Sequence, residues 1–422
     1  MSSYLAVLKN SYFLHLWLGQ ITSQIAVNML AFILLIRVYQ NTMSNIAVSG
    51  MILAIGIPAI VVGILAGGIV DQVDKRLVLI YCNILRALVL VLFYWFSSSL
   101  AFIYLLGFVF SIITQFFVPA EAPSIPTIVK NTDLLTANSL FTFSLYVATI
   151  IGFVLSGPAL RLFGNNNIYI FLAGLMGLSA MLVMKLPKDK KKNNVLNLTW
   201  AKMIADGRDG IRFIRKNKRI EQSLFLLTFT QALIAILASL APGFADKTLA
   251  IVLEDSSYLV MGPAAVGLIL GSLVIGAWGK FFLKRILILV GIMGTGLTLL
   301  LLSFLVRVSH QSYLSFYIGN LPLGGLEAAI IILVFLGFTN SLVSVPANTV
   351  LQEDTQGDIR GRVYGALTSL TGGAAILPVL LSGILADTIG IGKTLFIIGI
   401  GVLLFGFYRV LKLPTTSFNI EK

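Results

Sequence analysis

Three amide side chains follow one another at helical spacing near the amino terminus of this chain. Gln20, Gln24 and Asn28 stand at positions i, i+4 and i+8, which places them on one face of a helix, with Ser23 beside them. The residues around them are apolar, and amides left without hydrogen-bond partners in apolar surroundings are costly. The spacing therefore indicates a face turned into the protein, either to bind a ligand or to hydrogen-bond a neighbouring helix.

One charged residue, Arg86, lies inside another apolar run. A charge near the middle of a membrane helix costs about 2.5 to 3.5 kcal/mol on the insertion scale. We therefore expect Arg86 to face protein or water, or to extend its stem toward the interface. Asp71 and Glu121 are its candidate partners, and both a structural ion pair and a direct functional role are open.

The residue types that carry metal or phosphate chemistry are sparse. The two histidines, His15 and His310, are far apart and have no cysteine or carboxylate at metal-ligand spacing. No glycine-rich run ends in Gly-Lys-Ser or Gly-Lys-Thr, the pattern that cradles nucleotide phosphates. We expect no metal, no cofactor and no enzymatic activity, and an ATP-driven pump is disfavoured.

The elements that must position these side chains are membrane helices. Of the 422 residues, 58% are hydrophobic and only 11% are charged, and the mean hydropathy is +0.96. A soluble domain carries about 25% charged residues. The chain is expected to be an all-α integral membrane protein with the lipid bilayer as its surroundings, and its basic residues are not expected to bind nucleic acid, because they cluster at the ends of apolar runs.

Reading apolar runs against their interruptions predicts twelve spans of about 20 residues each. The expected spans of the first half are 13–36, 46–70, 77–96, 101–120, 138–162 and 168–186. Those of the second half are 221–244, 262–283, 286–306, 327–348, 363–386 and 392–411.

The longest polar stretch, 187–220, separates the two sets of six and is rich in lysine and arginine. It is expected to be a cytoplasmic linker with an amphipathic helix, between an amino-terminal half (1–186) and a carboxy-terminal half (221–422). Most of the thirty basic residues fall on the same side of the membrane as this linker. The positive-inside rule then places both termini in the cytoplasm, as for a multi-pass protein of a bacterial-type inner membrane.

The two halves repeat one another in order. Val118-Pro119-Ala120 at the end of the fourth span recurs as Val345-Pro346-Ala347 at the end of the tenth. Ser156-Gly157 recurs as Ser382-Gly383, and Lys75-Arg76 recurs as Lys284-Arg285. Two parallel six-helix halves related by an axis along the membrane normal are a known transporter architecture.

The loop after the second span carries a more specific pattern. Gly67, Asp71, Lys75 and Arg76 match the signature between helices two and three of the major facilitator superfamily, although Gln72 and Asp74 depart from it. The chain resembles this superfamily over nearly its whole length, and within it the macrolide-efflux-like and siderophore-exporter-like branch. Gly157-Pro158 resembles the helix-five motif of exporters, with Arg161 where a glycine is usual.

The resemblance implies roles for particular residues. It implies a major facilitator fold whose helices one, four, seven and ten line a central cavity, and a carboxylate at Asp71 that helps to close the cytoplasmic side. Gly67, Lys75 and Arg76 are expected to gate together with Asp71. Arg360, Gly361 and Arg362 lie beside the acids Glu353, Asp354 and Asp358, and are expected either to latch the cytoplasmic side or to anchor the helix there as positive-inside charges. The candidates for the substrate cavity are Gln20, Ser23, Gln24, Asn28, Thr114, Gln115, Thr228, Gln231, Asn340, Ser341 and Ser344. The candidates for ion coupling are Asp71, Glu121, Asp246 and Glu327.

We expect a monomeric secondary transporter that exports a hydrophobic or amphiphilic small molecule, drug-like or siderophore-like, by alternating access coupled to protons. A lysophospholipid-type flippase is the alternative within the same class. A transport-inactive membrane receptor or scaffold is the alternative of another class. The sequence leaves open the substrate, the coupling ion, the direction of transport and the oligomeric state.

Overall fold

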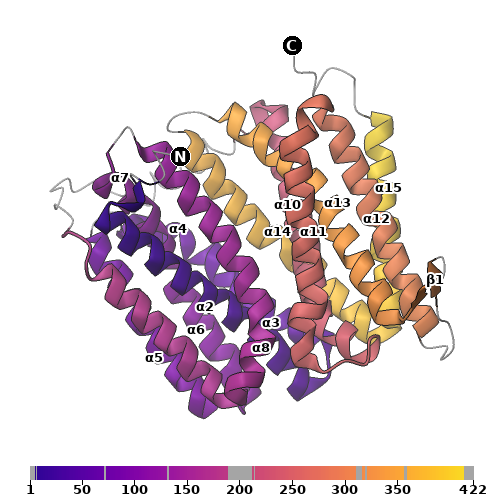
Figure 1. The fold of residues 1–422 in the computed structure, drawn as a ribbon, viewed down its shortest axis with the longest axis horizontal. Coiled ribbons are helices and arrows are strands. Elements are labelled where there is room, and N and C mark those ends of the chain that lie inside the picture. The colour runs from indigo at the N-terminus through magenta and orange to yellow at the C-terminus, as the bar shows by residue number, and fades with distance from the viewer. Residues whose placement is uncertain are drawn as a thin grey trace. The chain divides into compact units, whose positions relative to one another are not determined.

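The computed structural model of the protein describes residues 5, 7–70, 73–130, 133–188, 212, 214–309, 316–318, 321–355 and 359–412. It is built almost entirely of helices (Figure 1). The chain divides into two compact units: Met1–Asn41 with Leu53–Leu198, and Thr42–Ile52 with Thr199–Lys422. We refer to them as unit 1 and unit 2.

The helices from the first half of the chain follow the expected spans, with two differences. Their bounds are α2 (Ser11–Thr42), α3 (Asn45–Val61), α4 (Gly63–Val70), α5 (Lys75–Phe96), α6 (Leu100–Glu121), η1 (Ala122–Ser124), α7 (Ile125–Ile128) and α8 (Leu134–Val183). The expected second span is divided between α3 and α4, and the fifth and sixth are continuous in α8. Within α8, Gly164 has a φ of 76°, a left-handed conformation that glycine adopts without steric cost, and there the helix kinks.

The core of unit 1 lies where the helices meet. Phe13 and Leu16 of α2, Leu79 of α5 and Phe117 of α6 are buried together in one apolar cluster. Further along α5, the Phe93 ring stacks on the Tyr169 ring of α8 with centroids 5.2 Å apart, and α5 packs against both α6 and α8. Apolar residues recur on the inner faces of these helices, and the outer faces keep large exposed apolar side chains such as Leu88 and Trp95, as expected for helices surrounded by lipid.

Unit 2 holds the helices of the second half. Their bounds are α10 (Lys218–Lys247), η3 (Leu253–Asp255), η4 (Ser257–Met261), α11 (Gly262–Trp278), η5 (Gly279–Phe281), α12 (Lys284–Ser309), α13 (Gly325–Asp354), α14 (Ile359–Ile389) and α15 (Ile391–Lys412). Between α12 and α13, the strands β1 (Phe316–Ile318) and β2 (Leu321–Leu323) pair antiparallel with Tyr317 opposite Pro322. The hydropathy pattern does not predict this short hairpin.

Glycines set the packing of unit 2. A Cβ on Gly267 of α11 would meet the carbonyl oxygen of Val334 on α13, and a Cβ on Gly337 of α13 would meet that of Ala264 on α11. The two helices therefore approach backbone to backbone, as small residues permit between membrane helices. α12 packs against α13 and α15 (Figure 1).

Nine helices among the described residues are long and apolar enough to cross a membrane, and two shorter apolar helices, one of them α3, accompany them. Because α8 contains two expected spans and α14 contains the eleventh, the described helices agree with twelve crossings. The twelve-helix, all-α membrane architecture expected from the sequence is confirmed.

Candidate functional site

Arg86 has the largest fully buried side chain of the described residues, with 1% of it exposed. Its Nε donates to the carbonyl oxygen of Cys82 at 3.3 Å, and its Nη2 donates to Oδ1 of Asn83 at 2.9 Å. The guanidinium carbon lies 4.2 Å from the ring centroid of Phe117 on α6, a cation–π arrangement. The charge is held inside unit 1 rather than turned to lipid.

Glu121 at the end of α6 supplies the opposite charge. It is 5% exposed, and its Oε1 has no hydrogen-bond partner among the described residues. The charges of Arg86 and Glu121 attract one another. A buried carboxylate with an unbonded oxygen is costly when ionised. Glu121 and Arg86 thus place one acidic and one basic side chain inside unit 1.

A chain of hydrogen bonds extends from this charge across three helices. Asn83 on α5, which accepts from Arg86, donates from Nδ2 to Oγ of Ser179 on α8 at 2.9 Å. Ser179 in turn donates to the carbonyl oxygen of Gly19 on α2 at 2.8 Å. Sequence reasoning did not identify Asn83 or Ser179. The spacing of Asn83 and Arg86 at i and i+3 was the available signal for the first, and the partner on α8 leaves no local signal.

The amides of α2 bind to α8. Gln20 is buried, donates from Nε2 to the carbonyl oxygen of Phe141 at 3.3 Å, and accepts at Oε1 from Oγ of Ser144 at 3.0 Å. Asn28 donates to Oγ1 of Thr149 at 3.4 Å and to the carbonyl oxygen of Gln24 at 2.8 Å. Ser23 is buried beside them. The bonds to Phe141, Ser144 and Thr149 join α2 to α8 within unit 1. Gln24 and Asn28 are half-buried.

On α6 the two predicted cavity residues bond to their own helix. Thr114 donates from Oγ1 to the carbonyl oxygen of Phe110 at 2.9 Å, and Gln115 donates from Nε2 to that of Ser111 at 3.3 Å. Ser111 donates to the carbonyl oxygen of Ile55 on α3. Thr114 and Gln115 are half-buried. Because both bonds lie within α6, they do not connect α6 to another helix.

Unit 2 contains an apolar crevice of about 40 Å³ between four of its helices. Its lining residues are Leu233, Ile234 and Leu237 of α10, Ala264 and Leu268 of α11, Thr295 and Leu299 of α12, and Leu336, Gly337 and Asn340 of α13. The side chain of Asn340 is 6% exposed, and its Oδ1 accepts no hydrogen bond from the described residues. An unpaired buried carbonyl costs about 1 to 3 kcal/mol, and a ligand or a water that donates to it would offset this cost.

The other polar residues predicted on these helices are placed differently. Ser341 is buried and donates to the carbonyl oxygen of Phe338 on its own helix, and Ser344 is half-buried. On α10, Thr228 is half-buried with an Oγ1 that has no partner among the described residues, whereas Gln231 is exposed. Of the predicted set in unit 2, only Asn340 lines the crevice.

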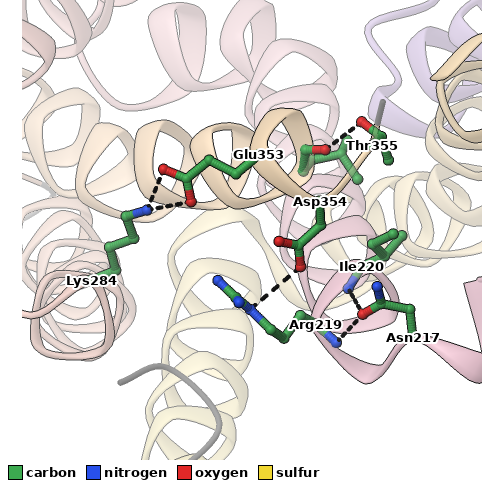
Figure 2. A network of polar contacts seen from close by, with 8 residues as sticks. Asn217, Arg219, Ile220, Lys284, Glu353, Asp354 and Thr355 are labelled. Atoms are coloured by element: carbon green, nitrogen blue, oxygen red, sulfur yellow. Dashed lines mark hydrogen bonds and ion pairs between the residues drawn. The ribbon is translucent and has the colours of Figure 1, made fainter. Parts of the chain in front are cut away.

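The ends of α10, α12 and α13 are joined by charge (Figure 2). Nζ of Lys284 at the start of α12 lies 2.7 Å from Oε2 and 2.9 Å from Oε1 of Glu353 near the end of α13. Arg219 Nε lies 3.4 Å from Oδ2 of Asp354. Asn217 caps α10 by accepting from the backbone N–H groups of Arg219 and Ile220. Glu353 and Asp354 thus pair with Lys284 and Arg219.

The predicted gating residues are only partly described. Asp71 lies outside the described residues. Gly67 is in α4 and Arg360, Gly361 and Arg362 are in α14, and only their helical backbone is described. Asp74 caps α5 by accepting from the backbone N–H of Arg76, whose Nη2 donates to the carbonyl oxygen of Met184. Lys75 is half-buried at the start of α5.

Three further predictions concern helix ends and α8. Asp246 is half-buried near the end of α10, and Glu327 is exposed in the first turn of α13. Within α8, Gly157 is buried and Pro158 is exposed.

Among the described residues, no group of three or more His, Cys, Asp or Glu side chains could hold a metal ion.

The sequence model of the Major Facilitator Superfamily matches residues 16–378 of this chain. The chain belongs to the Major Facilitator Superfamily. Two relatives from this superfamily align over most of both chains. Macrolide efflux protein A of Streptococcus pyogenes is 22% identical over 397 residues, which cover 92% of each chain. The multidrug efflux pump Tap of Mycolicibacterium fortuitum is 23% identical over 396 residues, which cover 88% of each.

The fold of this superfamily member is also that of solved transporters. The crystal structure of the nucleoside transporter NupG superposes with a TM-score of 0.73 over 97% of this chain and all of its own, at 15% sequence identity. This likeness establishes the fold. The protein is a multi-pass membrane transporter of the Major Facilitator Superfamily.

Proposed function

We propose that this transporter exports a hydrophobic or amphiphilic small molecule by alternating access of its two halves, driven by protons. The observation that carries the proposal is the crevice in unit 2, whose lining is apolar except for Thr295 and for Asn340, which has an Oδ1 without a hydrogen-bond partner among the described residues. Such a surface binds a ligand by apolar contact and orients it by one or two hydrogen bonds. The two efflux proteins that align along nearly the whole chain support the same direction of transport.

The size of the crevice limits what enters it. A volume of about 40 Å³ holds a small apolar group or a water rather than a drug-sized molecule, since pockets for whole ligands measure about 300 to 1,000 Å³. We therefore infer that it receives one apolar branch of a larger substrate, with a hydrogen-bond donor directed to Asn340. The amides of α2, Thr114, Gln115, Thr228, Gln231, Ser341 and Ser344 remain proposed contacts for the rest of the substrate.

Proton coupling is assigned to Glu121 in this proposal. It is the buried carboxylate, its Oε1 is unbonded among the described residues, and its charge interacts with Arg86. In the ionised state Glu121 and Arg86 neutralise one another, and in the protonated state Arg86 keeps its bonds to Cys82, Asn83 and Phe117. Asp71, Asp246 and Glu327 are the other coupling candidates. Asp246 and Glu327 are less buried.

The remaining features of the proposal follow from the sequence. Asp71 is proposed to close the cytoplasmic side together with Gly67, Lys75 and Arg76, and Arg360, Gly361 and Arg362 to contribute from the start of α14. The protein is proposed to act as a monomer without enzymatic activity in a bacterial-type inner membrane, with both termini and the linker 187–220 in the cytoplasm between the halves 1–186 and 221–422.

The test is uptake into inside-out proteoliposomes with an imposed pH gradient, inside acidic. A hydrophobic cation, a macrolide, a siderophore and a lysophospholipid are offered in turn to the wild-type protein. Saturable uptake of one of the first three, abolished when a protonophore collapses the gradient, is expected. Asp71→Asn is expected to reduce the rate of uptake. Uptake of the lysophospholipid alone, or uptake that is indifferent to the gradient, would contradict the proposed substrate class or the proposed coupling.

A further inference from the structure

The first turn of α3 is bonded to a carboxylate from the other end of the chain. Asp387, near the end of α14, accepts at Oδ1 from the backbone N–H of Asn45 at 2.9 Å and from its side-chain Nδ2 at 2.8 Å. At Oδ2 it accepts from the backbone N–H of Ile46 at 3.0 Å and from Oγ of Ser44 at 2.5 Å. One side chain therefore receives four hydrogen bonds.

These bonds satisfy groups that a helix leaves unpaired. The first N–H groups of a helix have no partner within it, and the partial positive charge of that end attracts an anion. A cap usually comes from the residue just before the helix. Ser44 caps α3 in this way, because its Oγ accepts from the backbone N–H of Ala47 at 3.3 Å. The backbone N–H groups of Asn45 and Ile46 bond instead to Asp387, which is 342 residues away from Asn45 along the chain. The sequence Ser44-Asn45 indicates a helix start, but nothing local indicates this partner.

The surrounding surfaces fit closely. A Cβ on Gly383 of α14 would meet Oγ of Ser49 and the backbone of Asn45 and Ile46, and a Cβ on Gly243 of α10 would meet Oδ1 of Asn45. Ser49 is fully buried and donates to the carbonyl oxygen of Val379 at 3.0 Å. The start of α3 is thus held by polar bonds at its tip and by glycine-permitted contact along its side.

The segment that contains the first turns of α3 is connected at both ends to unit 1. Residues Thr42–Ile52 belong to unit 2, whereas the residues before and after them, Met1–Asn41 and Leu53–Leu198, belong to unit 1. A movement of one unit against the other must therefore bend α3 or release its first turns from α14. Pro58 lies in α3 beyond the part that belongs to unit 2.

We propose that Asp387 is a positioning residue of the transport cycle, a latch that holds the first turns of α3 against α14 and must release them when the substrate leaves. The expected topology places this end of α14 outside the membrane, opposite to the cytoplasmic gate at Asp71. The inference rests on the proposed transport by alternating access, because only then is release required. The latch acts through α3 and does not itself contact substrate.

The first test measures exposure of the buried Ser49 without any substrate. Ser49→Cys is made in a Cys82→Ser background, so that one thiol remains, and its labelling by a membrane-impermeant maleimide is followed in intact cells. Asp387→Asn is expected to raise the labelling rate about tenfold. Ser44→Ala, which removes one of the four bonds together with the bond from the N–H of Ala47, is expected to raise it by a smaller factor. Glu254→Gln, which removes a carboxylate from η3, is the charge-matched control and is expected to leave the rate unchanged.

The second test replaces the latch by a covalent bond. In Ser44→Cys/Asp387→Cys, again with Cys82→Ser, copper phenanthroline accepts the two electrons released when the thiols form a disulfide. Transport by the oxidised protein is expected to fall below about a tenth of that of the dithiol form, because the disulfide keeps the first turns of α3 on α14. Transport is expected to recover when dithiothreitol cleaves the disulfide and α3 can again leave α14.

The two tests separate the latch from the proposed function. A raised labelling rate in Asp387→Asn supports the latch even if no substrate is transported by the wild type, a result that would count against the proposed function alone. Unchanged labelling in both Asp387→Asn and Ser44→Ala overturns the latch. Full transport by the oxidised double-cysteine protein, with the disulfide verified by mass spectrometry, overturns it as well.

Discussion

Units 1 and 2 differ in the polar side chains of their candidate sites. In unit 1, Gln20 and Ser144 bond to one another, and Asn83 links Arg86 to Ser179. In unit 2, the carbonyl of Asn340 and the hydroxyl of Thr228 have no partner among the described residues. Two halves with repeated sequence patterns have thus come to differ in chemistry. Unit 1 holds a buried charge, and unit 2 holds an unpaired acceptor, to which we propose that a substrate donates a hydrogen bond.

The largest expected effect concerns the charges of unit 1. Arg86→Met leaves the carboxylate of Glu121 buried without the opposite charge, and removing one member of a buried charge pair in this way costs about 3 to 5 kcal/mol. Arg86→Met with Glu121→Gln removes both charges and is expected to recover most of this loss. The measurement is the thermal stability of the detergent-solubilised protein for both single variants and the double variant. Equal losses that simply add in the double variant would show that the two charges are independent.

The glycine contact between α11 and α13 is the next to test. Gly267→Ala places a methyl group against the carbonyl oxygen of Val334, so the helices must separate, at a cost of about 1 to 3 kcal/mol. Gly276→Ala on the same helix meets no atom within 4 Å and is the matched control. Thermal unfolding should distinguish the two variants. A Gly267→Ala protein as stable as Gly276→Ala would contradict the close approach.

A smaller effect is expected at the crevice of unit 2. Asn340→Leu removes the unpaired carbonyl and extends the apolar lining, so a substrate with a hydrogen-bond donor should bind about tenfold more weakly, the equivalent of about 1.4 kcal/mol. An analogue whose donor is methylated should bind the variant no more weakly than the wild type. Thr349→Val on the same helix, where the hydroxyl bonds to the carbonyl oxygen of Val345, serves as the control. Equal losses for both ligands would indicate a packing effect instead.

The smallest effect is expected at the charged helix ends of unit 2. The side chain of Glu353 is 48% exposed, and exposed ion pairs contribute about 0 to 1 kcal/mol. Lys284→Gln should therefore lower the thermal stability only slightly, and the difference from the wild type should shrink at high salt. A loss comparable to that of Arg86→Met would show that this pair is as important to the fold as the buried charges.

Hydropathy was sufficient to predict the membrane helices, because lipid imposes apolar runs of fixed length on every span. The repeat of the two halves was read from short recurring motifs such as Val118-Pro119-Ala120 and Val345-Pro346-Ala347. It did not predict the continuity of α8 through Gly164, the division between α3 and α4, or the short strands. Those features depend on backbone conformation and on residues between the spans. The sequence likewise located Arg86 and Glu121, whose charges are conspicuous in apolar runs.

Partners from distant parts of the chain were beyond the reach of sequence reasoning. Asn83 bonds to Ser179, Lys284 to Glu353, and Asp387 to Asn45. In each case the sequence around one residue gives no signal of its distant partner. The amides of α2 show the same limit in another form. Their spacing predicted an inward face, but only the structure shows Gln20 bonded to Phe141 and Ser144 of α8.

The most direct test of proton-driven export is proton movement triggered by substrate. Wild-type protein and Glu121→Gln are reconstituted with a pH-sensitive dye, and the transported substrate is added in the absence of any other driving force. The wild type is expected to move protons against the substrate, and Glu121→Gln is expected to move none while still exchanging labelled for unlabelled substrate. Undiminished proton movement in Glu121→Gln would contradict the coupling role of this carboxylate. Substrate transport without proton movement in the wild type would contradict the central claim.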